Sequence, residues 1–156
     1  MSNPQTVVDQ AFSKLEEHLD AIEIRDAKVS AWSVGMQIHH SLLAANAILD
    51  TLISSEPGLR NPGKSIRLAV VLKLRKIPRG RGKSPDAAIP DEDVSREELE
   101  RLLESARMKL SATEQTSPDA WWDHHIFGVM TLESALCFLG VHTEHHLSII
   151  DDIRKA

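Results

Sequence analysis

Two histidines near the end of this 156-residue chain have a spacing that can bind a metal ion. His142 and His146 are four residues apart, which places both on one face of an α-helix. Two imidazoles in this arrangement can coordinate one ion at about 2.0–2.1 Å. The alternative is a pair of core histidines whose nitrogens are satisfied by hydrogen bonds to side chains or water. The spacing favours the metal over that alternative.

The segment around this pair predicts a helix over about residues 131–154. Apolar residues recur along one face of it, with His142 and His146 in their midst. The apolar members of this face are Leu132, Ala135, Leu136, Leu139, Ile149, Ile150 and Ile153. The pair therefore points into the protein, where an imidazole is costly unless its nitrogens are satisfied. His145 lies at the flank of this face and is a candidate to orient a ligand or relay a proton.

A third ligand must come from a facing helix. The stretch over about residues 30–53 predicts one, and it contains His39 and His40. On a helical wheel His40 aligns with apolar residues, so it is the expected third ligand or, alternatively, a buried polar residue between helices. His39 aligns with Asn46 and Asp50, a polar strip, and is expected on the surface or beside the metal ligands.

The rest of the chain predicts an all-α fold, a four-helix bundle with a long crossover between its second and third helices, as a single domain over residues 1–156. The expected helices span about residues 4–26, 30–53, 95–110 and 131–154. Residues 65–77 fit a strand or a helix, and we favour a helix because no second strand candidate is present. A capping box is expected at Ser95 and Glu98. Residues 78–93 and the segment with Trp121 and Trp122 are expected to be loops.

Composition limits the partners. The formal net charge is −5, so neither nucleic acid nor a membrane is expected as a partner, and no apolar run is long enough to span a bilayer. The single cysteine, Cys137, can form no internal disulfide and agrees with a cytoplasmic location. It lies on the helix face opposite His146, so any reacting thiol should come from the substrate.

Several further residues are candidates outside the ligand set. Asp123, like His39 and His145, could orient a ligand or relay a proton. His124 and His125 could contact a substrate or form a solvated turn. The basic loop that contains Arg79, Arg81 and Lys83 could bind carboxylates or phosphate, or be a solvated connector.

These motifs resemble the DinB/YfiT-like superfamily of four-helix-bundle metalloenzymes over about residues 30–154. The resemblance rests on Trp32-Ser33 eight residues before His40, on Phe127-Gly128, and on the run Leu139-Gly140-Val141-His142-Thr143-Glu144-His145-His146. In that family one helix-2 histidine and a terminal HxxxH pair bind a single divalent metal, usually zinc or nickel. The resemblance implies His40, His142 and His146 as ligands. Many members continue with Arg-Gly-Gln, whereas Leu147-Ser148-Ile149 follows here.

The resemblance also implies a homodimer that acts on a small molecule, because several branches use low-molecular-weight thiols. Trp32, part of the shared motif, is a candidate substrate contact. Three protein ligands leave a coordination position open, as in catalytic zinc sites. The expected function is thus a metal-dependent enzyme, a thiol-dependent transferase or a hydrolase. The alternative is a noncatalytic, dimeric helical module that binds a metal or ligand and is associated with stress.

Overall fold

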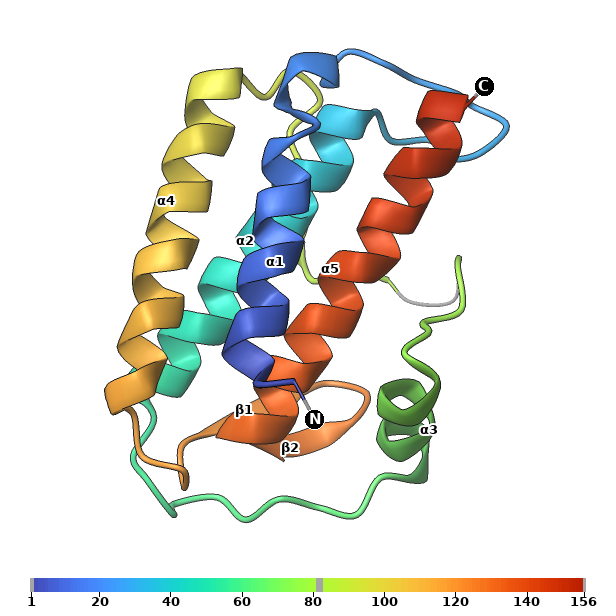
Figure 1. Ribbon diagram of the computed structural model, residues 1–156. Coiled ribbons are helices and arrows are strands. Elements are labelled where there is room, and N and C mark those ends of the chain that lie inside the picture. Colours follow the sequence, from blue (N-terminus) through green and yellow to red (C-terminus); the bar gives the residue numbers. More distant parts are fainter. Residues whose placement is uncertain (1, 81–82, 156) are drawn as a thin grey trace.

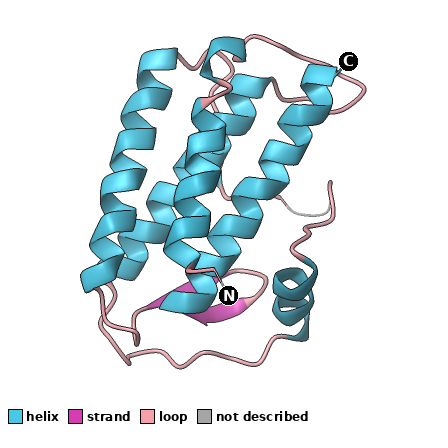
Figure 2. Cartoon of the chain, in the orientation of Figure 1, coloured by secondary structure: helices cyan, strands magenta, loops and turns pink. Residues whose placement is uncertain are grey.

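The computed structural model describes residues 2–80 and 83–155, which are mostly helical (Figures 1 and 2). The described α-helices are α1 (Pro4–Glu16), α2 (Val34–Ser54), α3 (Ile66–Leu74), α4 (Arg96–Ala112) and α5 (Leu132–Lys155). Single 3₁₀ turns occur at Leu19–Ala21, Asp86–Ala88 and Thr113–Gln115. The expectation of a mainly helical protein is confirmed, and so is the choice of a helix for residues 65–77.

Serine side chains determine where three of these helices begin. Ser33, Ser65 and Ser95 precede α2, α3 and α4, and each hydroxyl oxygen accepts a hydrogen bond from the amide three residues later, at 3.1–3.2 Å. Only half of the expected capping box forms. The Glu98 carboxylate accepts two hydrogen bonds from the Arg101 guanidinium, at 2.6 and 2.8 Å, instead of reaching back to Ser95.

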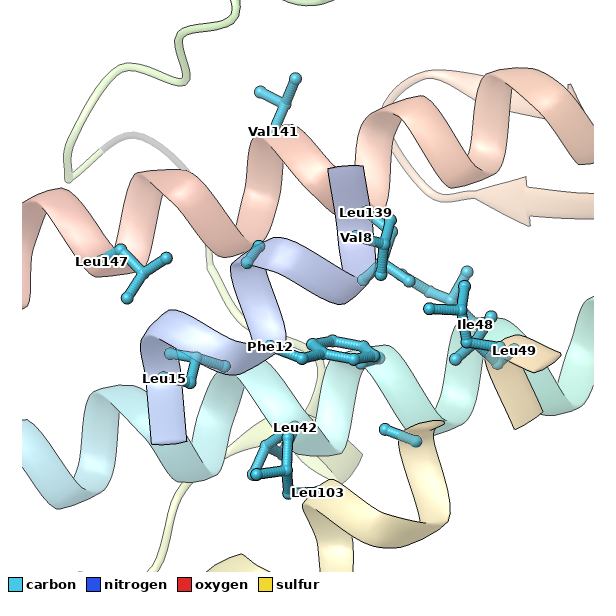
Figure 3. Packing of buried hydrophobic residues seen from close by; sticks show 14 of the residues in the cluster. Val8, Phe12, Leu15, Leu42, Ile48, Leu49, Leu103, Leu139, Val141 and Leu147 are labelled. Atoms are coloured by element: carbon cyan, nitrogen blue, oxygen red, sulfur yellow. The ribbon is translucent and has the colours of Figure 1, made fainter. Parts of the chain in front are cut away.

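The long helices α1, α2, α4 and α5 lie side by side (Figure 1). Helix α1 packs against α4 and α5, and α2 packs against the same two helices. Phe12 of α1 lies at the centre of the core, with Leu42 of α2, Leu103 of α4 and Leu139 of α5 from the neighbouring helices (Figure 3). All four side chains are buried. The inward face predicted for residues 131–154 is buried as expected.

The first helix is shorter than predicted, because α1 ends at Glu16 rather than near residue 26. The residues that follow are used to begin α2 instead. The carbonyls of Ile22 and Ile24 accept hydrogen bonds from the amides of Gly35 and Val34, at 2.9 and 3.0 Å. These amides have no hydrogen-bond partner within α2, and the turn supplies one for each. The residues of this turn therefore do not continue α1 as a helix.

The segment expected to be a loop before the last helix contains a β-hairpin. Strands β1 (Trp121–His124) and β2 (Gly128–Thr131) pair antiparallel, with Trp122 opposite Met130. Gly128 has φ of 76°, a left-handed conformation that suits glycine and is common where a three-residue hairpin loop ends. The hairpin leads directly into α5 and packs against α2 and α5.

The long connection between α2 and α4 contains α3, which lies beside α5 and packs against it (Figure 1). Two arginines after α3 attach it to α5. Arg75 donates to the Glu144 carboxylate at 2.8 Å, and Arg79 donates to Ser148 and Asp152 at 2.8 and 2.9 Å. No helix in the described part of the chain is both long and apolar enough to cross a membrane.

Candidate metal centre

Three histidines from two helices meet beside the core. His40 comes from α2, and His142 and His146 come from adjacent turns of α5. One ring nitrogen of each lies within 4.8 Å of the others. His40 and His146 are buried, with 4% and 7% exposure, whereas His142 is half-buried. The three residues predicted as ligands therefore lie close enough together to bind one ion.

The backbone of the connection fixes the His40 ring. Its Nδ1 lies 2.7 Å from the carbonyl oxygen of Ala88. A carbonyl can only accept, so His40 Nδ1 carries the proton and donates. In the neutral ring the lone pair is then on Nε2, the atom that faces His142. Such a hydrogen bond from the distal nitrogen is usual for histidines that bind metals, because it fixes the tautomer and the ring orientation.

A side chain does the same for His146. Its Nδ1 lies 2.7 Å from Oε1 of Gln37, which is buried one turn before His40 on α2. As the Gln37 amide is oriented in the structure, its Nε2 donates to the Ser30 hydroxyl at 3.0 Å and its Oε1 faces His146. His146 therefore donates from Nδ1 and keeps a lone pair on Nε2.

His142 is the exception among the three. Its Nε2 lies 3.3 Å from Nε2 of His40, and its buried Nδ1 has no hydrogen-bond partner in the described residues. Two nitrogens bound tetrahedrally at about 2.0–2.1 Å from zinc would be about 3.3–3.4 Å apart, so the spacing suits a shared ion. An ion would replace the hydrogen bond between the two Nε2 atoms, and Nδ1 of His142 has no partner among the described residues in either case. The donor set therefore fits a divalent metal.

Burial keeps these imidazoles neutral. It lowers the pKa of His142 to about 3 and that of His146 well below its ordinary value, and repulsion among the rings lowers both further. Burial also lowers the pKa of His40, although the hydrogen bond to Ala88 opposes this shift. Only a neutral imidazole has the lone pair that binds a metal, so the electrostatics of the site favour the binding form.

Aromatic rings surround the three histidines. The Trp32 ring centre lies 5.1 Å from that of His40 and 6.5 Å from that of His146. Phe138, one turn before His142 on α5, lies 6.0 Å from it. Trp32 is only half-buried, so the aromatic surroundings of His40 and His146 extend to the protein surface.

His124 and His125 differ in their surroundings. The half-buried ring of His124 packs against Trp122, Phe127 and Phe138, and its Nδ1 accepts hydrogen bonds from the amides of Ile126 and Phe127. Burial lowers the pKa of His124 to about 4. This histidine closes the hairpin turn. His125 stacks on His124 and is exposed.

Of the two positions expected for His39, the surface or beside the metal ligands, the surface position is wrong. His39 is 4% exposed, and its Nδ1 accepts the Asp91 amide at 3.0 Å. Asn46, in the same polar strip of α2, is also buried and faces α4: its amide donates to the Leu102 carbonyl, and its Oδ1 accepts from the Ser105 hydroxyl. His39 and His40 thus bond to the same connecting segment, at Asp91 and Ala88, on either side of Ile89 and Pro90. His39 therefore supports the His40 side of the site only through this segment.

Two other candidate supporting residues lie in different places. Asp123 is turned away from the histidines, because it alternates along β1 with Trp122 and His124 and pairs with Arg60 at 3.1 Å. Its predicted role beside the metal ligands is therefore not supported. His145 packs against His146 with ring centres 4.9 Å apart, and burial lowers its pKa while the Ile77 backbone opposes this shift. His145 remains adjacent to the site.

The basic loop divides into three cases. Arg79 is committed to Ser148 and Asp152, so its first role is to attach the connection to α5. Lys83 is exposed, and Arg81 lies outside the described residues.

Cys137 is half-buried, and burial raises its pKa. It lies near Glu133 and Arg75, whose charges also influence its pKa.

Sequence reasoning missed Gln37 and Ala88, the two residues that orient the ligands. Gln37 precedes His40 by three residues, so the helical period already placed it on the same face. A buried glutamine beside a candidate ligand is a signal for such a partner. Ala88 offered no signal, since only its backbone acts and any residue supplies a carbonyl.

Two cavities of the described residues lie away from the histidines. One of about 580 Å³ lies between the start of α1 and the start of α5, and one of about 260 Å³ lies between the Ile22 turn and residues 92–94. Comparisons of the chain with models of protein families, with curated proteins and with solved structures give no match. The functional assignment therefore rests on the geometry of the three histidines.

Proposed function

We propose that this chain is a metalloprotein in which His40, His142 and His146 bind one divalent ion, zinc or nickel. The observation that carries the proposal is the orientation of two of these rings. His40 and His146 both donate from Nδ1 to protein oxygens, which leaves Nε2 of each free for a metal. Core histidines without a metal need no such common orientation.

We further propose that the site is catalytic. An ion held by three imidazoles has an open position, where it supplies Lewis acidity toward water or a thiol. The protein would orient two ligands through Ala88 and Gln37, and Trp32 would pack against the substrate. His145 is the nearest further group that could carry a proton. These features support a hydrolase or a thiol-dependent transferase acting on a small molecule.

A noncatalytic metal-binding module is the second candidate. It is favoured by the position of the two cavities described above, both of which lie away from the histidines. Enzymes commonly bind a small substrate in a cavity beside the reacting groups. A module of this kind would bind the ion and a small ligand without turnover.

The proposed architecture is a four-helix bundle of α1, α2, α4 and α5 with a long crossover, as in the DinB/YfiT-like superfamily. The packing of these four helices supports it. Membership of that superfamily and a homodimeric state are proposed with it, on the resemblance of the motif around Trp32, His40 and the HxxxH pair. A cytoplasmic location is proposed because the chain has a single cysteine.

Turnover distinguishes an enzyme from a noncatalytic metal-binding module. The metal-loaded protein should be incubated with low-molecular-weight thiols and an electrophile, and separately with esters and amides, while product is followed by mass spectrometry. A transferase or hydrolase should give product that His142→Ala does not give, whereas Gln10→Ala, on the exposed side of α1, should keep the activity. Thiol binding without product in every reaction would favour the module.

A further inference from the structure

Helix α3 presents apolar side chains to solvent. Ile66, Val70 and Leu74 recur every four residues along it and are 83%, 48% and 62% exposed. Its opposite side packs on the protein, where Val71 is buried. Figure 1 shows α3 beside α5 and apart from the other long helices. We call the exposed side with Ile66, Val70 and Leu74 the α3 face.

Cations flank this face. On a helical wheel Arg67 lies on one side of the three apolar residues and Lys73 on the other. Both are exposed, as are Lys64 before the helix and Lys76 after it. No ion pair of the described chain involves these four residues. Arg60 and Arg75, by contrast, are paired with Asp123 and Glu144.

The charge pattern is local. Residues 57–77 contain six Lys and Arg residues and no Asp or Glu, in a chain whose formal net charge is −5. The net charge of the whole chain argued against polyanionic partners, but it is the sum of this basic segment and a more acidic remainder. A surface with unpaired cations around exposed aliphatic side chains suits an anionic partner that is also apolar.

We propose that the α3 face docks on an anionic lipid bilayer, with Ile66, Val70 and Leu74 entering the interface and Arg67 and Lys73 among the headgroups. The size of the face favours lipid over protein. Helix α3 has nine residues and is about 13 Å long, which is too short for the roughly 800 Å² that each partner buries in a stable protein complex. A bilayer requires no complementary groove.

A symmetric dimer through this face is disfavoured. A two-fold axis would bring Arg67 and Lys73 of one protomer near the same cations of the other, and the repulsion would oppose association. Aliphatic side chains also offer nothing to stack on nucleic acid bases, which are usually bound by aromatic rings or arginine.

Vesicle co-sedimentation of the full chain tests the proposal. The vesicles are of phosphatidylcholine alone or of an equimolar mixture with phosphatidylglycerol. We expect binding to the mixed vesicles that weakens as salt is added, and little binding to the neutral ones. Val70→Asp should reduce binding roughly tenfold or more by placing a charge in the interface. Lys73→Glu should reduce it roughly fivefold or more.

Matched controls come from other surfaces of the chain. Met108→Asp changes an apolar residue that is 69% exposed on α4, and Lys14→Glu makes the same charge change on α1. Both should bind the mixed vesicles as the wild type does. Circular dichroism should show that all four variants keep their helices.

Three results would overturn the proposal. The first is no binding to the mixed vesicles. A crosslinker placed at position 70 that then captured an acidic protein would assign the face to a protein partner instead. The second is an equal loss of binding in Lys14→Glu and Lys73→Glu, which would mean that only net charge matters. The third is an oligomer that forms without vesicles and is lost in Val70→Asp, which would assign the face to a second copy of the chain.

Discussion

Gln37 and His146 lie 109 residues apart in the chain, and Oε1 of Gln37 accepts a hydrogen bond from Nδ1 of His146 at 2.7 Å. The bond joins α2 to α5 at the point where the three histidines meet. It directs Nε2 of His146 toward its neighbours and makes that nitrogen a better electron donor. Because Gln37 is also buried and bonded to Ser30, its orientation is fixed before any ligand binds.

Replacement of Gln37 by leucine should weaken metal binding without removing it. The His146 ring would lose the acceptor that orients it, and residues in such positions typically contribute about 10- to 100-fold to affinity. Isothermal titration with Zn²⁺ gives the dissociation constant. Gln10→Leu, on the exposed side of α1, is the matched control and should bind Zn²⁺ as the wild type does. Equal affinity in the two variants would show that Gln37 does not support a ligand.

The metal-free protein should lose stability as the pH falls below about 6.5. Unfolded histidines titrate near that value, whereas burial lowers the pKa of His142 to about 3 and that of His124 to about 4. Between these limits the unfolded chain binds protons that the folded chain does not bind. The folding equilibrium constant should then fall by at most about tenfold per pH unit for each such group.

Urea unfolding in the presence of a chelator, from pH 7.5 down to pH 4.5, measures this dependence. His124→Asn keeps an acceptor for the hairpin amides but removes one titrating group, so its stability should fall less steeply with acid. A free energy of unfolding that stays constant over this range would contradict the buried, neutral state of these histidines.

Gly35 should not tolerate a side chain. A Cβ at this position would lie 3.0 Å from both Cβ and the carbonyl oxygen of Ile22. The same carbonyl accepts the Gly35 amide, so the turn cannot move away without breaking that bond. Gly35→Ala should lower the free energy of unfolding by about 1–3 kcal/mol. Gly63→Ala, where a Cβ meets open space, should change it little.

The helices of this fold were largely predictable, because their apolar faces and serine caps are local signals. The predicted segment 95–110 corresponds to α4, and the predicted segment 131–154 corresponds to α5, with boundaries within about two residues. The early end of α1 was not predictable from periodicity. It depends on the docking of Ile22 on the first turn of α2, a contact between segments that the helical pattern does not encode.

The hairpin could have been found from its turn. Gly128 after a three-residue loop, with aromatic residues before it, is a hairpin pattern that we missed because each strand has only four residues. The three histidines could be predicted because the spacing of His142 and His146, and the helix face on which each histidine lies, are properties of a single helix. His39 and Asp123 were misplaced because their surroundings come from α4, residue 91 and Arg60, which are distant in sequence.

The metal content of the protein, purified without a tag and reloaded with Zn²⁺ or Ni²⁺, tests the central claim most directly. Elemental analysis should find about one ion per chain in the wild type and in His125→Ala. It should find almost none in His40→Ala, His142→Ala or His146→Ala, provided that circular dichroism shows each variant to be folded. One ion per chain in all three folded ligand variants would contradict the proposed centre, and so would a wild type that binds no ion.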